Sequence, residues 1–143
     1  MDISKKVEQL KPSGIRLFFD LVLNMKDVIS LGVGEPDFVT PWHIREKAIF
    51  SLEQGYTSYT SNKGMIELRK MICHHLQKRH GLSYDPEEET LITVGVSEGL
   101  DLAVRAILNP GEKVLVPDPS YVSYPAVVEL AGGKVVALNT DLS

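Results

Sequence analysis

The chain has 143 residues, 43% of them hydrophobic and 24% charged, with a net charge of −4. This composition excludes a disordered or collagen-like chain, and the length is enough to bury one hydrophobic core. The absence of a long basic run argues against binding to nucleic acid or to a membrane surface, and no apolar run reaches the roughly 18 residues of a bilayer span. With one cysteine and no apolar N-terminal signal, we expect a soluble, cytoplasmic protein.

The first segment with regular periodicity predicts a helix over residues 15–25, where apolar residues recur at helical spacing and Ser13 can cap the first turn. Residues 28–31 are apolar enough for a short buried strand. The glycines and proline in residues 32–37 then predict a shaped loop.

A second helix is predicted to begin at Thr40 and Pro41, with the proline in the first helical position, and to end at Gly55. We expect its apolar stripe to be buried. The stripe consists of Ile44, Ala48 and Leu52. Residues 56–63 are polar and read as a loop.

A third helix is predicted over residues 65–79, with Gly81 as its stop. Its expected buried face consists of Met65, Leu68, Met71, Ile72 and Leu76. Neighbouring His74, His75, His80 and Cys73 lack the spacing of metal ligands, so no metal site is expected.

From residue 90 onward, strands and helices alternate with short connections. We expect strands at 91–94, 114–116 and 135–138, and helices at 97–108 and 121–131. This alternation is the pattern of βαβ units in a parallel sheet, so the fold class is α/β. No helix follows the last apolar strand, and parallel sheets are normally covered on both faces, so we expect an incomplete domain.

The junction between the first of these strands and its helix is the segment most suggestive of chemistry. Unpaired backbone N–H groups at a helix N-terminus bind phosphate, Gly95 allows close approach and the Ser97 hydroxyl adds a donor. Glu98 would oppose a phosphate unless its side chain points away. Taken alone, this segment is more simply read as a tight turn at Gly95 and a helix cap at Ser97.

Other candidates depend on their position beside the sheet. Tyr121 follows a strand at the edge where parallel sheets bind ligands, and can stack on a planar ring or simply lie at the surface. Tyr59 could donate to a phosphate or be an ordinary surface residue. Asp118 lies where a ribose-binding acid would be found, but the glycines within residues 32–34 and 95–99 do not form a dinucleotide fingerprint. Asp101 and Arg105 are read as a surface ion pair.

Five segments, taken in order, form a specific pattern. They are residues 13–16 (SGIR), 29–41 (ISLGVGEPDFVTP), 56–64 with 67–69 (YTSYTSNKG and ELR), 93–98 (TVGVSE) and 118–125 (DPSYVSYP). Together they resemble the class I, fold type I aminotransferases that use pyridoxal 5′-phosphate (PLP), in the aspartate and aromatic aminotransferase group. The resemblance covers essentially the whole chain.

The resemblance implies a role for each matching residue. Gly34 matches the glycine whose N–H meets the substrate α-carboxylate, and Tyr121 matches the aromatic residue stacked on the cofactor ring. Tyr59 matches the tyrosine that reaches the cofactor phosphate of the other subunit, which implies a homodimer. Three residues match the turn that holds the phosphate: Gly95, Val96 and Ser97.

The resemblance also implies a domain plan and a missing part. Residues 1–27 would form an N-terminal arm and the start of a small domain, and residues 28–143 the first part of a large PLP-binding domain. The lysine that forms a Schiff base with PLP would lie beyond residue 143, so the chain alone is expected to be inactive.

Several alternatives stay open. The chain could be a non-catalytic remnant that binds phosphate or a partner chain, or a nicotinamide-binding half-domain. The family match does not choose among amino acids and 2-oxo acids as substrates, nor between transamination and C–S lyase chemistry.

Overall fold

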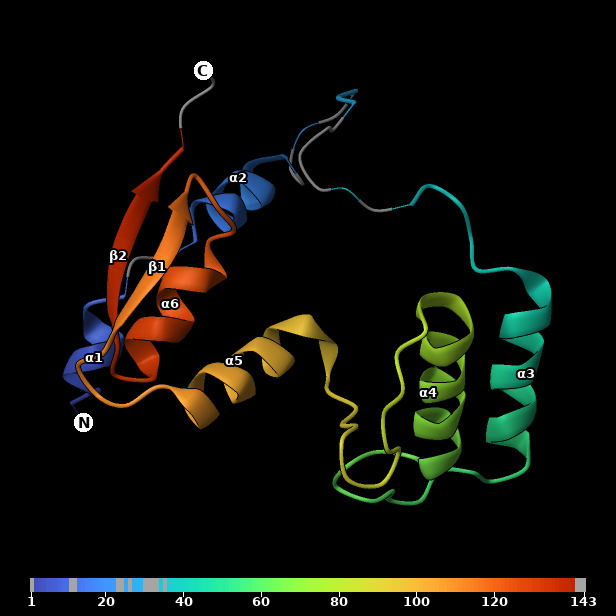
Figure 1. Ribbon diagram of the computed structural model, residues 1–143. Helices are drawn as coiled ribbons and strands as arrows, with labels where there is room; N and C mark the ends of the chain where they lie inside the picture. Colours follow the sequence, from blue (N-terminus) through green and yellow to red (C-terminus); the bar gives the residue numbers. More distant parts are fainter. Residues whose placement is uncertain are drawn as a thin grey trace. The chain divides into compact units, whose positions relative to one another are not determined.

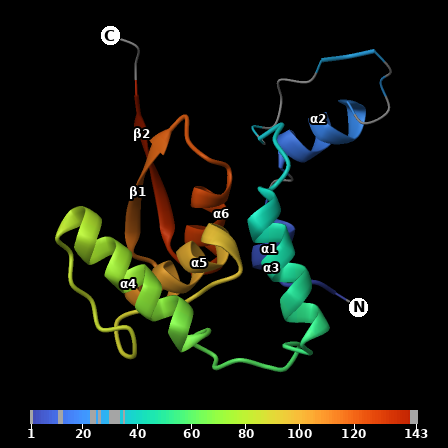
Figure 2. The ribbon, with the colours of Figure 1, turned by 90° about the vertical axis from the view of Figure 1, so that its right-hand side faces the viewer.

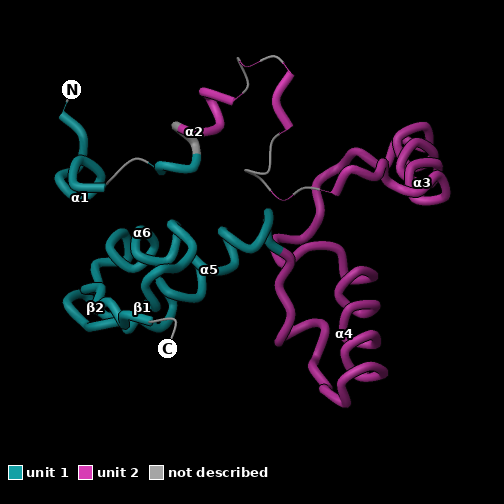
Figure 3. Tube along the Cα trace, turned by 90° about the horizontal axis from the view of Figure 1, so that it is seen from above, with its two compact units in different colours: residues 1–17, 93–143 teal, residues 18–92 magenta. Residues whose placement is uncertain are grey.

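The computed structural model describes residues 2–10, 13–22, 25, 27–29, 34 and 36–140 (Figure 1). Its elements in chain order are α1 (Lys5–Glu8), α2 (Gly14–Val22), α3 (Trp42–Glu53), α4 (Ile66–His80), α5 (Gly95–Ile107), β1 (Lys113–Asp118), α6 (Ser123–Leu130) and β2 (Lys134–Asn139). The chain divides into two compact units, Met1–Leu17 with Thr93–Ser143, and Phe18–Ile92 (Figure 3). The domain boundary expected at residue 27 stays a prediction.

The first unit is built on a small parallel sheet. Strands β1 and β2 pair in parallel along their whole length, which confirms both strands and their predicted direction. Helix α6 connects the strands in sequence and packs on the sheet (Figures 1 and 2). Val116, Val127 and Val128 are buried between helix and sheet. Burying an apolar side chain of this size contributes about 1.5–3 kcal/mol, so this contact is the core of the unit.

Two further helices complete this unit by packing on α6. They are α1 and α5. The start of α5 at Gly95 is two residues earlier than predicted, and its end at Ile107 is one residue earlier. The first turn of α5 therefore lies within residues 95–97, the segment suspected of binding phosphate.

The strand predicted at residues 91–94 does not form. A strand requires a hydrogen-bonded neighbour, and β1 and β2 pair with each other. The N–H of Ile92 instead donates to the Lys63 carbonyl at 3.1 Å. High β-propensity over four residues was therefore insufficient to predict a strand here.

Helix α3 differs from expectation at its start and on its surface. Pro41 is the N-cap residue and not the first helical residue, so Thr40 lies outside the cap. The predicted stripe is not buried: Ile44 is 51% and Leu52 is 66% exposed. No described element packs against α3, which explains why the stripe lacks cover. The helix does end just before Gly55, as predicted.

Helix α4 has the predicted bounds within one residue, but only part of the expected face is covered. Ile72 and Leu76 are half-buried and the other three residues of that face are exposed, whereas Arg69 and Cys73 are buried. These two residues are one turn apart and both bond to the segment 86–90. The path of that segment, which periodicity does not reveal, decides which face is covered.

The N-terminal predictions are confirmed in part. Helix α2 matches the helix predicted at 15–25, although it ends at Val22. The strand predicted at 28–31 is wrong for Val28 and Ile29, which have no strand structure and are 51% and 91% exposed. The rest of that strand lies outside the described residues.

Candidate functional site

The suspected phosphate turn lies at the start of α5, which begins with Gly95. Gly95 has a φ of +80°, a conformation that side-chain-bearing residues rarely adopt. Its N–H donates to the Thr93 carbonyl at 2.9 Å, and the Thr93 hydroxyl donates to the Gly95 carbonyl at 2.9 Å. A Cβ added at Gly95 would meet no atom within 4 Å. The glycine therefore shapes the turn and leaves open space beside it.

The two residues after Gly95 are open to solvent. Val96 is 87% exposed, and Ser97 is also exposed. The N–H groups in the first turn of a helix have no intrahelical acceptor and lie at the positive end of the helix dipole. An anion as small as phosphate can therefore reach these amides and the Ser97 hydroxyl.

Glu98 adds a negative charge to the same turn. Its carboxylate accepts a hydrogen bond from the Val94 N–H, in the manner of a capping box. The carboxylate is thus bonded to an amide that precedes the helix, and not to the amides of residues 96 and 97. This hydrogen bond identifies the amide that the side chain contacts, and it keeps the negative charge at the N-terminal end of α5.

Tyr121 lies in the loop after β1 and is 52% exposed. Its ring packs edge to face against Tyr124, with centroids 5.8 Å apart and planes at 78°. The Tyr121 carbonyl accepts from the Tyr124 N–H at 3.0 Å, which holds the ring beside the start of α6. Because Tyr121 is about half exposed, its ring remains accessible for stacking on a planar ligand.

Two predicted site residues belong to the second unit, Phe18–Ile92. Tyr59 is fully exposed in the loop between α3 and α4, and Gly34 is exposed with no atom within 4 Å of a built Cβ. The structure therefore brings neither residue into contact with another predicted site residue within that unit. Their assigned roles stay predictions.

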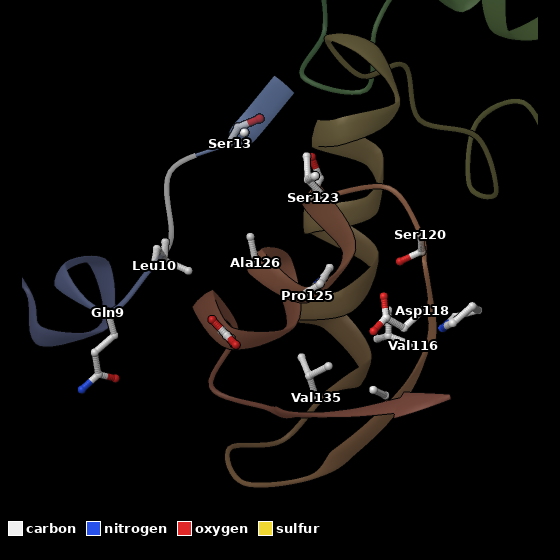
Figure 4. A pocket seen from close by; sticks show the side chains of 15 residues that line it. Gln9, Leu10, Ser13, Val116, Asp118, Ser120, Ser123, Pro125, Ala126 and Val135 are labelled. Carbon is white, nitrogen blue, oxygen red and sulfur yellow. The ribbon is translucent and has the colours of Figure 1, made fainter. Parts of the chain in front are cut away.

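A cavity of 610 Å³ lies in the first unit between the N-terminal segment, β1 and α6 (Figure 4). Leu10 and Ser13 lie on one side in this view, and Asp118 and Ser120 on the other. Asp118 and Glu129 contribute carboxylates, and none of the described lining residues is basic. Because the ionisable side chains here are acidic, this cavity does not fit a phosphate.

Arg69 is a residue whose environment the sequence did not predict. It is only 5% exposed, and its Nη1 donates to the Pro86 carbonyl at 2.6 Å. A basic residue in a helix is normally read as solvated, so the helical pattern carries no signal for this burial. The link becomes visible only when the path of the acidic segment 86–90 is known.

The ion pair predicted from the sequence lies on the surface of α5. Asp101 and Arg105 form the predicted surface pair at 2.8 Å, and this hydrogen bond raises the pKa of Arg105. Among the described residues, no cluster of histidine, cysteine or carboxylate side chains could hold a metal ion. Within the same residues, no helix combines the length and apolar character of a membrane span.

The family described as aminotransferase class I and II matches residues 26–142. The chain belongs to this family. A putative aminotransferase, YugH of Bacillus subtilis, is 58% identical over 138 residues, which make up 96% of this chain and 36% of that protein. An aspartate aminotransferase of Pyrococcus abyssi is 45% identical over 140 residues, 98% of this chain and 36% of that protein.

Solved structures agree with the sequence relatives. The aspartate aminotransferase of Thermus thermophilus with maleate has a TM-score of 0.88 and 40% identity, covering 98% of this chain and 37% of that one. Pyrococcus protein-A1 also has a TM-score of 0.88, with 45% identity and coverage of 95% and 35%. These matches confirm the α/β, fold type I prediction. This aminotransferase-family chain spans about a third of the length of the relatives it matches.

Proposed function

We propose that this chain supplies the N-terminal portion of a PLP-dependent aminotransferase, which moves an amino group between an amino acid and a 2-oxo acid. The observation that carries the proposal is the exposed first turn of α5, residues 95–97, in a chain of the aminotransferase family. The cavity beside β1 carries two carboxylates and no basic side chain among its described lining residues, so we place the cofactor phosphate at the helix turn instead. Membership of this family also argues against the nicotinamide-binding alternative.

The residues of this turn fit the phosphate of PLP. The backbone at Gly95 opens the space, the amides of Val96 and Ser97 point out of the first helical turn, and the Ser97 hydroxyl adds a donor. Tyr121 would cover the pyridine ring with its exposed half. PLP, when bound, supplies an electron sink for the negative charge that develops on the substrate.

The roles proposed for the second unit involve substrate and a second copy of the chain. The Gly34 N–H would bind the substrate α-carboxylate. Tyr59 is fully exposed, as expected of a residue that donates its hydroxyl across a homodimer interface to the other cofactor phosphate. We place residues 1–27 in the arm and small domain, residues 28–143 in the large domain, and the enzyme in the cytoplasm.

We infer that the 143-residue chain does not transaminate by itself. The role of the Schiff-base lysine requires a side chain directed at the cofactor from the C-terminal end of a later strand. Lys47, Lys70 and Lys78 lie on helices α3 and α4, and Lys113 and Lys134 are the first residues of β1 and β2. Each of these positions is unsuited to that role.

The test compares two probes that differ only in the phosphate, pyridoxine 5′-phosphate and pyridoxine. Neither carries an aldehyde, so neither reacts with surface lysines. We expect isothermal titration to show at least about tenfold tighter binding of the phosphorylated probe, which is about 1.4 kcal/mol. Equal affinities would refute the phosphate site.

A charge-matched pair of variants locates the site. Ser97→Asp places a carboxylate beside the phosphate and should abolish the preference for pyridoxine 5′-phosphate. Two like charges about 4 Å apart repel each other by about 1 kcal/mol or more. Ser83→Asp makes the same charge change at an exposed position of the other unit and should retain the preference. Equal losses in both variants would show that the turn is not the site.

A further inference from the structure

An unusually close contact joins the loop that carries Tyr59 to the segment that enters the phosphate turn. Gly64, which follows that loop, has a φ of +88°. A Cβ built on Gly64 would lie 2.6 Å from the Ile92 Cβ and 2.7 Å from its Cγ1. Real Cβ atoms do not approach this closely, so Ile92 packs directly on the backbone at residue 64. Only glycine satisfies both the dihedral angle and the contact.

Hydrogen bonds on either side hold this contact in place. The Ile92 N–H donates to the Lys63 carbonyl at 3.1 Å. The Lys63 ammonium donates to the Glu87 carbonyl at 2.7 Å and lies 3.4 Å from the Glu88 carboxylate. We call Lys63, Gly64 and Ile92 the Gly64 anchor.

Helix α4 holds the same segment from a second direction. Buried Arg69 donates to the Pro86 carbonyl at 2.6 Å. The Cys73 sulfur and the Thr90 hydroxyl lie 3.2 Å apart. The segment from 86 to 92 is therefore fixed to α4 as well as to Lys63 and Gly64, all within one compact unit.

Both proposed phosphate-contacting segments of the chain are attached directly to this anchor. Tyr59 lies four residues before Lys63, and Gly95 lies three residues after Ile92. Between Ile92 and Gly95, Thr93 forms two hydrogen bonds of 2.9 Å with Gly95, which restrict the connecting backbone. The anchor thus limits the paths by which the chain can enter each segment.

We propose that Gly64 is a positioning residue for cofactor-phosphate binding, because it lets Ile92 pack on the backbone and so holds the entry to the turn at residues 95–97. This inference rests on the proposed function. It adds that one anchor serves two sites of a homodimer, the phosphate turn of its own subunit and the Tyr59 loop extended to the other subunit.

The experiment compares Gly64→Ala with Gly55→Ala in the 143-residue chain. Both glycines have positive φ, +88° and +74°, but a Cβ at Gly55 meets nothing within 4 Å. Both variants therefore carry the same type of backbone strain, and only Gly64→Ala displaces Ile92. We expect Gly64→Ala to reduce the preference for pyridoxine 5′-phosphate over pyridoxine at least about tenfold, since small misplacements of a binding group cost this much. Gly55→Ala should stay within about twofold of wild type.

Residue-resolved hydrogen exchange provides a readout that does not depend on the cofactor. We expect faster exchange at the Ile92 and Gly95 amides in Gly64→Ala and wild-type exchange in Gly55→Ala. Should Gly64→Ala fail to fold, Lys63→Met removes the ammonium contacts at a partly exposed position and should shift both readouts in the same direction.

The outcomes separate the two proposals. A wild-type chain with no preference between the probes contradicts the proposed function. A wild-type preference that survives in Gly64→Ala, or that falls equally in Gly55→Ala, overturns the positioning role alone. Unchanged exchange at Gly95 in Gly64→Ala overturns it as well, whatever the probes show.

Discussion

Arg69 carries a buried charge in the described part of the chain. Burying a guanidinium is costly unless its N–H groups are hydrogen-bonded. One nitrogen bonds the Pro86 carbonyl at 2.6 Å, while Nε is buried without a partner. The guanidinium thus holds the loop at residue 86 to helix α4, and the unpaired Nε adds an unfavourable desolvation term to the free energy of folding.

Replacing Arg69 tests this link. Arg69→Ala removes a charged hydrogen bond and leaves a carbonyl unpaired, so the free energy of unfolding should fall by about 2 kcal/mol. Urea unfolding measures the change, with Lys70→Ala as a control at a neighbouring exposed position. The control should change stability by less than about 0.5 kcal/mol. An Arg69→Ala chain as stable as the control would contradict the account.

Glu112 predicts a pH effect of defined sign. Its carboxylate accepts from the Asn109 backbone N–H at 2.7 Å and from the Asn109 side-chain amide at 3.2 Å, and these bonds lower the pKa of Glu112. A lowered folded-state pKa adds stability above the ordinary glutamate range, and this contribution is lost as pH falls through the lowered value. Carboxyl NMR titration should show a pKa below the ordinary range, and Glu112→Gln should weaken the acid dependence of unfolding. A titration at or above the ordinary pKa would refute this.

At the residue scale, local chemistry was predictable and long-range contacts were not. Gly95 was singled out because a glycine lets a phosphate approach the backbone closely, and the structure places it first in α5 with a positive φ. The burial of Arg69 and the contact of Gly64 with Ile92 depend on how a distant segment folds back. Neither has a signature in residue type or spacing.

Among the elements, α5 carries both a stabilising helix cap and the proposed phosphate site in its first turn. Its first turn is capped by the Glu98 carboxylate on the Val94 N–H, and the negative charge lies at the positive end of the helix dipole. The cap satisfies an amide just before the helix, the Gly95 N–H bonds to the Thr93 carbonyl, and the amides of residues 96 and 97 stay open. Helix stability and phosphate binding therefore use different N–H groups of the same turn.

Variants of Glu98 test the cap. Glu98→Ala should lower the free energy of unfolding by about 1 kcal/mol, whereas Glu98→Gln keeps an acceptor and should lose about half of that. Asp101→Ala removes an exposed ion pair one turn later and should cost at most about 0.5 kcal/mol. Chemical denaturation followed by circular dichroism gives all three values. If Glu98→Ala costs no more than Asp101→Ala, the cap contributes nothing.

A predicted strand formed only where another strand could pair with it. Strands β1 and β2 were predicted from their apolar runs, and they form because each pairs with the other. Residues 91–94 are as apolar, yet no strand pairs with them and Ile92 bonds to a loop. Helix bounds were predictable from glycines and periodicity, but the buried face of α4 and the exposed stripe of α3 depend on neighbours.

At the scale of the whole molecule, the proposed function rests on the relation to known proteins. It spans about a third of the length of the aminotransferases it matches. The proposed phosphate turn, ring-stacking tyrosine and Tyr59 loop belong to this third. The expected Schiff-base lysine does not belong to this third, so the proposed function separates cofactor binding from catalysis.

This separation gives a direct kinetic prediction. The 143-residue chain mixed with PLP, an amino acid and 2-oxoglutarate should show no transamination above the rate of free PLP. Coupled assays of glutamate formation measure this, with heat-denatured chain as the control for reactive surface lysines. Turnover above both backgrounds would show that a lysine within the chain serves the reaction.

The central claim is that residues 95–97 hold the cofactor phosphate, and amide NMR tests it most directly. The ¹⁵N-labelled chain is titrated with pyridoxine 5′-phosphate and, separately, with pyridoxine. We predict that the largest shifts occur at the amides of Gly95, Val96 and Ser97, and only with the phosphorylated probe. Shifts confined to other residues, or equal shifts with both probes, would contradict the claim.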